Sequence, residues 1–221
     1  MAADAHVNYA RATENDVNDV LNFVMDNFIG EETIGQAVGL TPTASVRQFY
    51  SDFVGPSVRS SVSFVARNSA MQVVGVRLAE ISGPGDYDQK LERFFAYDFP
   101  DEPLMIMIEF MKYVFNRLDP DYTLSKAKKV LVFNLLCVHK DHRRQGIARK
   151  LSQLSIDAAK AKRCDVALVI ATGFQAQSFY RKLNFEAALE VSYSEFHGAY
   201  KEQPIVPKNG SGLCQVLVRT I

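Results

Sequence analysis

The sequence predicts a mixed α/β fold in which one twisted central sheet is flanked by helices. Segments rich in β-branched residues alternate with segments whose apolar residues recur at helical spacing, from one end of the chain to the other. The 221 residues, 48% of them hydrophobic, suffice for one well-buried core, and no internal repeat or low-complexity segment divides them. We therefore expect a single domain over residues 1–221.

The first half of the chain is expected to alternate strands and helices. Apolar residues from Val17 to Phe28 recur at helical spacing, and Asp16 lies where the positive end of that helix would be. Gly75 interrupts a β-branched segment and indicates a bulge. The elements expected here are a strand at 6–13, a helix from Val17 to about Gly30, a helix that begins at Thr41-Pro42-Thr43 and ends at Gly55-Pro56, and strands at 61–67 and 71–81.

The second half continues the alternation. Asp101-Glu102-Pro103 is typical of a helix start, and Asp119-Pro120 would stop that helix after Leu118. The segment 130–138 is almost wholly apolar, as expected of a strand covered on both faces. The later elements expected are a helix from Ile147, a strand at 166–172, a short helix at 176–183 with Asn184 in a left-handed conformation at its end, and strands at 185–196 and 213–221.

A strand, a basic turn and a helix adjoin between residues 130 and 161, and together they predict an anion site. The first amides of a helix have no partners within it, and the helix dipole places positive charge there. Gly146 and Ala148 would let a pyrophosphate approach these amides, and Arg143 and Arg144 would add charge. The alternative is an ordinary strand-to-helix turn with solvated arginines. Two other phosphate-binding loops, GxxxxGK and GxGxxG, do not occur in the sequence.

The string Arg143-Arg144-Gln145-Gly146-Ile147-Ala148 resembles the Gln/Arg-x-x-Gly-x-Gly/Ala signature of the GNAT N-acetyltransferase superfamily. A second segment, 176–185, is similar to a helix motif of that superfamily, with Ala176, Tyr180 and Phe185 in register. The resemblance implies the GNAT fold, and it implies that the amides of 143–148 bind the pyrophosphate of acetyl-CoA, the co-substrate. It also implies that the central strand splays at a bulge, so that free amides near Leu136, Cys137 and Val138 face the thioester and pantetheine.

Tyr180 occupies the position that in many superfamily members protonates or touches the departing CoA sulfur. A phenol with an ordinary pKa of about 10 is a plausible acid for a thiolate. A half-buried core tyrosine with a satisfied hydroxyl is the alternative interpretation. A covalent acyl intermediate on Cys137 is disfavoured, because no histidine base stands at a fixed spacing and an apolar strand raises the pKa of a thiol.

The chain more closely resembles the invertebrate arylalkylamine (dopamine-type) N-acetyltransferases. These carry an acidic pair just after the first helix, and the second acid is the catalytic base; Glu32 falls at that place, although Thr33 departs from the usual proline. A solvated acid beyond a helix end is the alternative for Glu32. The same relatives often carry two hydroxyls in a proton relay, at positions that correspond here to Thr172 and Ala176, so that only Thr172 keeps one.

The amino-acid composition limits the kinds of partner that the protein can have and the cellular compartment that we expect. Lysine plus arginine and aspartate plus glutamate number 25 each, so the net charge is zero, which disfavours nucleic acid as a partner. The three cysteines lie far apart in apolar segments, and the four histidines show no metal-binding spacing, so we expect neither a disulfide framework nor a metal. No apolar segment reaches the roughly 20 residues of a membrane span, and the N-terminus lacks a signal core. We expect a cytoplasmic monomer or weak dimer.

The predicted function is transfer of the acetyl group of acetyl-CoA to the primary amine of a small arylalkylamine, such as dopamine or serotonin, by direct attack in a ternary complex. Five aromatic residues could line an apolar amine pocket: Phe28, Tyr50, Phe94, Phe95 and Tyr97. Two alternatives stay open. The acceptor could be another primary amine, such as a polyamine or an amino acid, or the protein could be a non-catalytic acyl-CoA-binding sensor.

Overall fold

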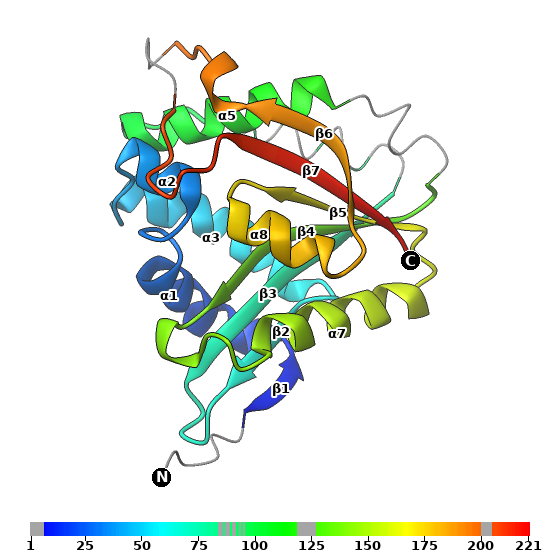
Figure 1. Ribbon diagram of the computed structural model, residues 1–221. Coiled ribbons are helices and arrows are strands. Elements are labelled where there is room, and N and C mark those ends of the chain that lie inside the picture. Colours follow the sequence, from blue (N-terminus) through cyan, green and yellow to red (C-terminus); the bar gives the residue numbers. More distant parts are fainter. Residues whose placement is uncertain are drawn as a thin grey trace.

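The computed structural model describes residues 7–83, 86, 89, 92, 94, 96–118, 127–199 and 205–221. Seven strands form one mixed sheet in the order β1-β2-β3-β4-β5-β7-β6 (Figure 1). Every neighbouring pair is antiparallel except β4 and β5, which run parallel at the centre. The strands are β1 (Asn8–Arg11), β2 (Phe64–Arg67), β3 (Val73–Ser82), β4 (Val130–Val138), β5 (Val166–Ala171), β6 (Glu186–Ser192) and β7 (Leu213–Thr220).

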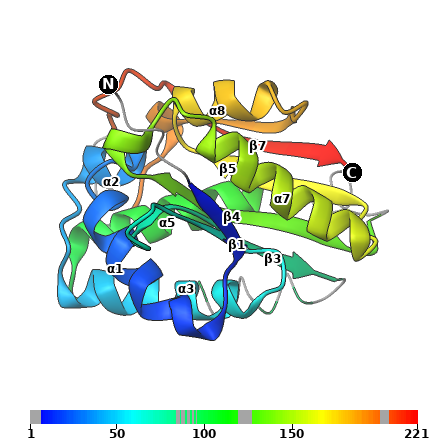
Figure 2. The same cartoon turned by 90° about the horizontal axis from the view of Figure 1, so that it is seen from below.

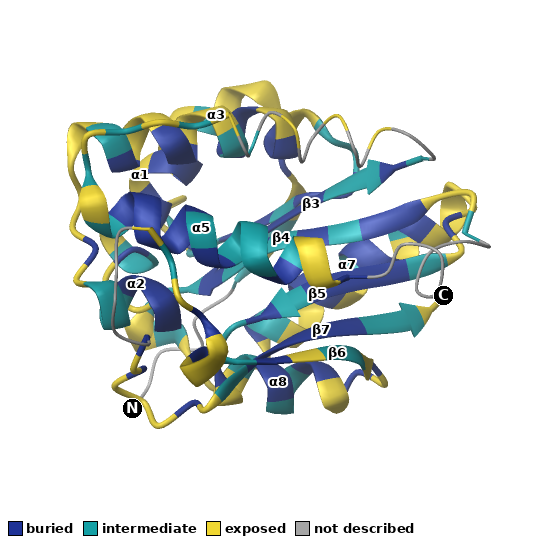
Figure 3. Cartoon of the chain, turned by 90° about the horizontal axis from the view of Figure 1, so that it is seen from above, coloured by how far each residue is buried: buried dark blue, intermediate teal, exposed yellow. Residues whose placement is uncertain are grey.

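Helices cover both faces of the sheet. Figure 2 shows α7 and α8 on one face and α1, α3 and α5 on the other. The helices are α1 (Val17–Asn27), α2 (Thr33–Val38), α3 (Ala44–Arg59), α5 (Glu102–Arg117), α7 (Ile147–Ala161) and α8 (Phe174–Arg181), with short 3-10 turns at Glu14–Asp16, Lys140–His142 and Tyr193–Glu195. Buried residues run along the central strands and the inner faces of the helices (Figure 3). This is the mixed α/β arrangement that the sequence predicts.

The central strand separates from its parallel neighbour halfway along its length. β4 pairs with β5 only from Val130 to Phe133. On its other side, the register with β3 shifts between Leu78 and Ala79, which leaves Asn134 as the extra residue of a bulge. The strand therefore splays from β5 after the bulge, and the edge of β4 that faces β5 is unpaired from residue 134 onward. The splay implied by the family resemblance is present.

Gly75 combines two roles on β3. The register between β2 and β3 shifts beside it, which confirms the predicted bulge. A side chain at this position would place its Cβ 2.9 Å from Cγ2 of Ile147 and 3.2 Å from Cδ1 of Leu151. The glycine thus lets α7 lie close against the sheet, and this fixes where α7 begins.

Several boundary predictions are wrong by two or more residues. α3 begins at Ala44, capped by the Thr43 hydroxyl, so Pro42 lies before the helix and not in its first turn. It also continues through Gly55-Pro56 to Arg59, because burial of Val58 against the core outweighs the local breaker signal. The helix expected at 176–183 spans Phe174–Arg181, and the strand expected to reach Phe196 ends at Ser192.

The six-residue helix α2 was not predicted. The Glu32 side chain caps its N-terminus, and Gly39, with φ of 76°, ends it in a left-handed conformation. The six residues between the two acids and Gly39 are too few to show helical periodicity, and Gly35 lies among them. The predicted stop at Asp119-Pro120 lies outside the described residues. Asp101 caps α5 and Asn184 has φ of 61°, as predicted.

Candidate active site

A pocket of about 910 Å³ opens where β4 and β5 separate. Its walls come from the end of α1, the start of α2, the second half of β4, the segment before α7, and α8. Segments more than 100 residues apart in the chain therefore meet at one cavity. It contains most of the residues that the sequence singles out for binding and chemistry, as the following contacts show.

One end of the pocket is the N-terminus of α7. Gly146 is the N-cap, and because glycine has no side chain, the first amides of the helix receive no side-chain cap. Gly146 has φ of 81°, and a Cβ there would meet no protein atom within 4 Å. Within the protein, the glycine is therefore required by its backbone conformation and not by lack of space. Ile147 and Ala148 also line this end.

The two arginines of the signature line the same end, and Gln145 does not. The side-chain amide of Gln145 instead donates to the Asp141 carbonyl at 3.3 Å. Nε of Arg143 donates to the Val138 carbonyl at 3.2 Å, which holds the guanidinium across the end of β4. Helix amides without a side-chain cap, beside two arginines, are chemically suited to bind an anion such as a pyrophosphate.

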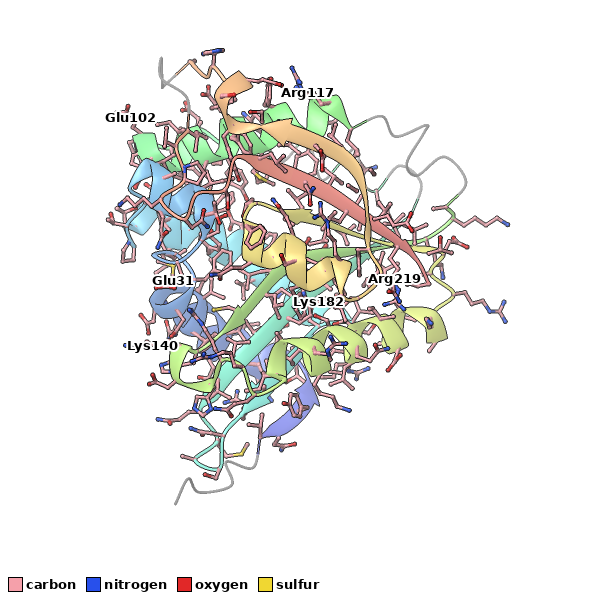
Figure 4. All side chains as sticks on the ribbon, in the orientation of Figure 1. Glu31, Glu102, Arg117, Lys140, Lys182 and Arg219 are labelled. Atoms are coloured by element: carbon pink, nitrogen blue, oxygen red, sulfur yellow. The ribbon has the colours of Figure 1, made fainter. Side chains whose placement is uncertain are left out.

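Arg143 also pairs with Glu31, at 3.2 Å between Nη1 and Oε2. Both side chains are about half exposed, at 44% and 57%. In Figure 4, Glu31 and Lys140 mark one edge of the molecule, where the loop after α1 meets the loop after β4. The acidic pair and the basic turn are thus direct neighbours, a contact that the sequence does not reveal.

Leu136, Cys137 and Val138 line the middle of the pocket, on the splayed part of β4. Burial raises the pKa of the Cys137 thiol to about 12, although the nearby Arg143 opposes this. The thiol is therefore protonated at neutral pH and has little nucleophilic character. This agrees with the preference for direct attack over an acyl-cysteine intermediate.

Glu32 and Thr172 are in contact where the loop before α2 meets the end of β5. The Thr172 hydroxyl donates to Oε1 of Glu32 at 2.6 Å, and Oε2 accepts from the Gly35 amide at 2.6 Å. Both residues line the pocket and are half-buried. The hydroxyl of Tyr193 donates to the Thr172 carbonyl and fixes the end of β5. The carboxylate is held at both oxygens and faces the cavity.

Glu32 lies among groups that stay neutral. Burial, and then the charge of Glu32, raise the pKa values of Tyr50 and Cys214 above their ordinary values. The pKa of Tyr193 is also raised, mainly by burial, then by the Cys214 thiol and then by the charge of Glu32. A carboxylate in such a setting favours a cation as its partner, as an ammonium substrate would be. Among the described residues that line the pocket, Glu31 and Glu32 are the two acids.

Tyr180, on α8, also lines the pocket and is buried, with an exposed fraction of 3%. Its hydroxyl accepts a hydrogen bond from Nη2 of Arg77. Arg77 is fully buried, packs over the Phe133 ring at 4.1 Å, and also lines the pocket. Sequence reasoning missed Arg77, and the signal was a basic residue within the mostly apolar segment Val73–Ile81, in which Glu80 is the other charged residue.

Aromatic side chains give much of the pocket its apolar character. Of the aromatic set predicted to line it, Phe28, Tyr50 and Phe94 do so, Tyr97 does not, and Phe95 lies outside the described residues. Ala176 lines the pocket without a hydroxyl, so Thr172 is the one relay position of the resemblance that can carry a proton. Other aromatic lining residues are Phe49, Phe53, Phe133 and Phe179.

In the part of the chain that the structure describes, no group of three or more histidine, cysteine, aspartate or glutamate side chains is arranged to hold a metal ion. Within the same part, none of the helices is at once long enough and apolar enough to cross a bilayer.

Comparisons with known proteins agree with this geometry. Residues 110–187 match the family described as an acetyltransferase (GNAT) domain. Among solved structures, the chain is similar to arylalkylamine N-acetyltransferase 2 from Aedes aegypti, with a TM-score of 0.85 and 19% identity over 98% of this chain and 99% of that one. A search of curated protein sequences found no match.

Two other solved structures show the same fold. Drosophila melanogaster polyamine N-acetyltransferase, which catalyses the formation of N-acetylagmatine, is similar with a TM-score of 0.80 and 15% identity over 98% of this chain and all of that one. Arabidopsis thaliana NAA60 in complex with acetyl-CoA is similar with a TM-score of 0.56 and 13% identity, over 98% of this chain and 100% of that one. At these identities the likeness establishes the fold.

Proposed function

We propose that this chain, in which residues 110–187 match an acetyltransferase (GNAT) domain, is an acetyl-CoA-dependent N-acetyltransferase whose acceptor is a small arylalkylamine, with Glu32 as general base. The observation that carries the proposal is the contact between Glu32 and Thr172 in the pocket that also contains the bare amides of α7. The hydrogen-bonded carboxylate of Glu32 suits the amine, and the amides at the start of α7 suit acetyl-CoA. Because both border one cavity, the two substrates of a direct transfer can bind side by side.

The donor fits the α7 end of the cavity. The amides that follow Gly146, together with Arg143 and Arg144, are suited to a pyrophosphate. The unpaired edge of β4 supplies backbone groups to a pantetheine chain, which would complete the strand interactions that the splay leaves open. Leu136 to Val138 are the residues proposed to carry these contacts.

The acceptor must lose a proton before it can attack, because an ammonium has no free electron pair. Glu32 is proposed to take this proton, either directly or through Thr172, whose hydroxyl already donates to Oε1. The hydrogen bonds from Thr172 and the Gly35 amide keep the carboxylate in one orientation. A backbone amide at the end of β4 is proposed to stabilise the oxyanion that forms as nitrogen attacks the thioester carbonyl.

The leaving sulfur then needs a proton. Tyr180 is proposed to supply it, because its hydroxyl accepts from Arg77 and keeps its own proton available to the pocket. Two protons leave the amine nitrogen in the complete reaction. One is balanced by the proton that ends on CoA, and the other is released to water.

The lining favours an aromatic acceptor over a polyamine. A polyamine or agmatine carries a second cation several carbons from the reacting nitrogen and needs an acid at that distance. In the described lining, Glu32 is proposed as the base and Glu31 is already paired with Arg143 at the rim. The rest of the acceptor side is largely aromatic, with Phe28, Phe49 and Phe53 among its residues. This surface suits an apolar ring.

Release of CoA thiol from acetyl-CoA, followed with purified protein and single amines, tests the proposal. We expect turnover with tryptamine, tyramine, dopamine and serotonin, and at least 10-fold lower kcat/KM with agmatine and spermidine. A higher kcat/KM for the polyamines would overturn the acceptor class. Binding of CoA without turnover of any amine would support a sensor. The matched control is Glu32→Gln, which keeps an oxygen to accept from Gly35 but removes the base.

A further inference from the structure

Arg77 is a buried cation that has no counter-ion among the residues that the structure describes. Its exposed fraction is zero, and it forms no ion pair with an acid of the described residues. Nη2 donates to Tyr180 and, at 3.1 Å, to the Ser152 hydroxyl, whereas Nε and Nη1 are buried without a hydrogen-bond partner. Burial of a charge without a paired counter-ion is strongly unfavourable. Because this cost is not offset by an ion pair, we infer that Arg77 has a functional role.

Arg77 borders the candidate active site as well as the hydrophobic core. It lines the pocket together with Tyr180, and its guanidinium lies 5.5 Å from the centre of the Tyr180 ring. Packing over Phe133, at 4.1 Å, stabilises the cation in place of a carboxylate. Burial lowers the pKa of Arg77, and the neighbouring Tyr180 opposes this. At neutral pH a guanidinium remains charged even so.

We propose that Arg77 is a positioning residue for thiolate departure, which it serves by orienting and supporting Tyr180. This inference rests on the proposed role of Tyr180 as the acid. A phenol has one proton to donate, and Arg77 occupies an acceptor position on its oxygen. No acceptor for the phenol proton occurs among the described residues, so the proton is left for a group in the pocket.

The charge balance of the step explains why the counter-ion is absent. When the carbon–sulfur bond of the tetrahedral intermediate breaks, its electron pair goes to sulfur, and the Tyr180 proton passes to that sulfur. The electron pair of the O–H bond remains on the Tyr180 oxygen, which becomes a phenolate next to the Arg77 guanidinium. The counter-ion of Arg77 is therefore the Tyr180 phenolate, which exists only after the proton has passed to sulfur. It disappears when water returns a proton to the phenolate. A resident carboxylate would cancel the attraction that favours this step.

A double-mutant cycle on the full-length protein tests the inference, with turnover of tyramine as the readout. We expect Arg77→Met to lower kcat about 10-fold or more, with the KM for acetyl-CoA changed less than about 3-fold. In the Tyr180→Phe background, the same substitution should change kcat less than about 2-fold, because Arg77 acts through the phenol. Arg77→Lys, which keeps the charge, should recover part of the loss.

Thermal unfolding separates this role from a structural one. Replacing an unpaired buried charge by an apolar side chain of similar size is expected to leave Tm unchanged or higher. The matched control is Arg67→Met on β2, where Arg67 pairs with Asp16 at 2.7 Å and Asp19 at 2.9 Å. That variant should lower Tm and leave kcat unchanged. A loss of kcat from Arg77→Met that persists in full without the Tyr180 hydroxyl would overturn the inference.

The same measurements distinguish the inference from the proposed function. If wild-type protein turns over no amine, the proposed function fails. If wild-type protein is active and the effects of Arg77→Met and Tyr180→Phe multiply, the inference about Arg77 fails while the acetyltransferase activity stands. A Tyr180→Phe variant with unchanged kcat would refute both the acid role and the inference.

Discussion

The hydroxyl of Thr172 lies 2.6 Å from Oε1 of Glu32 and donates a hydrogen bond to it. The two residues are 140 positions apart in the chain and meet because β5 ends where the loop before α2 crosses the pocket. The contact joins the proposed base to the one hydroxyl of the expected relay. It makes the mechanism testable at a single oxygen atom.

Thr172→Val removes the hydroxyl and keeps the shape of the side chain. A hydrogen bond to a charged group contributes about 1.5–3 kcal/mol, so its loss corresponds to a decrease in kcat/KM of about 10- to 150-fold if the whole bond serves the transition state. Thr172→Ser should recover most of this activity. Steady-state kinetics with tyramine checks the pair, and equal losses in Val and Ser variants would exclude the hydroxyl as the cause.

Glu32→Gln tests the base directly. The amide oxygen of glutamine can still accept from the Gly35 amide, so α2 should keep its cap and Tm should change little. We expect kcat to fall about 10²- to 10⁴-fold, the range of a lost general base. The Kd for CoA, measured by calorimetry, should stay within about 3-fold of wild type. Turnover at the wild-type rate would remove Glu32 from the mechanism.

Variants at Gly146 distinguish the effect of backbone conformation from the effect of a side chain that occupies the space of the ligand. Gly146→Val forces a β-branched residue to φ of 81° and should lower stability by about 1–3 kcal/mol and abolish the rise in Tm on adding CoA. Gly146→Asn is the matched control, because asparagine tolerates a left-handed conformation. If Gly146→Asn is as stable as wild type but also shows no response to CoA, the side chain blocks the ligand. A full response in both variants would contradict a pyrophosphate site here.

The pair between Glu31 and Arg143 predicts a competition. Arg143 is held by Glu31 in this structure, and a pyrophosphate would attract the same guanidinium. An exposed ion pair contributes only about 0–1 kcal/mol, so Glu31→Gln should lower the Kd for CoA by no more than about 5-fold. Arg143→Met should raise the Kd, and the further effect of Glu31→Gln should then vanish. Additive effects in the double variant would show that the two side chains act independently.

The predicted elements that the structure confirms most closely are those whose signal is local. The strand at 130–138 and the helix from Ile147 have the expected bounds, because a β-branched run and an amphipathic stripe are each readable within one segment. The breaker residues Gly55-Pro56 misled the prediction of α3, because a long-range contact of the next turn prevails over them. Local signals therefore place elements better than they place their ends.

The site divides in the same way. The glycine and arginines of the α7 turn form one continuous string, so they could be recognised from the sequence. The contacts that organise the pocket join distant positions: Thr172 with Glu32, Arg143 with Glu31, and Arg77 with Tyr180. The sequence nominates most members of these pairs by residue type or motif, but not Arg77. It cannot show which members meet, because their meeting depends on how β4 and β5 separate.

Cys137 provides a prediction about pH. Its pKa rises from the ordinary value of 9.0 to about 12 in the folded protein, mainly through burial. Below about pH 9 the thiol is protonated in both states and its contribution to stability is complete. Between about pH 9 and 12 the unfolded chain loses this proton first, so the free energy of unfolding falls as pH rises.

Urea unfolding of wild type and Cys137→Ala between pH 8 and 10.5 measures this contribution. Because the other buried acids titrate alike in both proteins, the stability of wild type should fall more steeply above pH 9 than that of the variant. Turnover by Cys137→Ala should stay within about 3-fold of wild type, since the thiol is not a nucleophile in the proposed reaction. Parallel pH curves would show that burial does not protect the thiol.

A crystal structure with a bisubstrate analogue, in which CoA is joined through an acetyl bridge to the nitrogen of tryptamine, tests the proposed active site most directly. We expect its pyrophosphate on the amides after Gly146, its sulfur beside the Tyr180 hydroxyl, and its indole among Phe28, Phe49 and Phe53, with the bridging nitrogen near Glu32. An analogue bound with its phosphates away from α7, or with its nitrogen far from Glu32 and Thr172, would contradict the proposed mechanism.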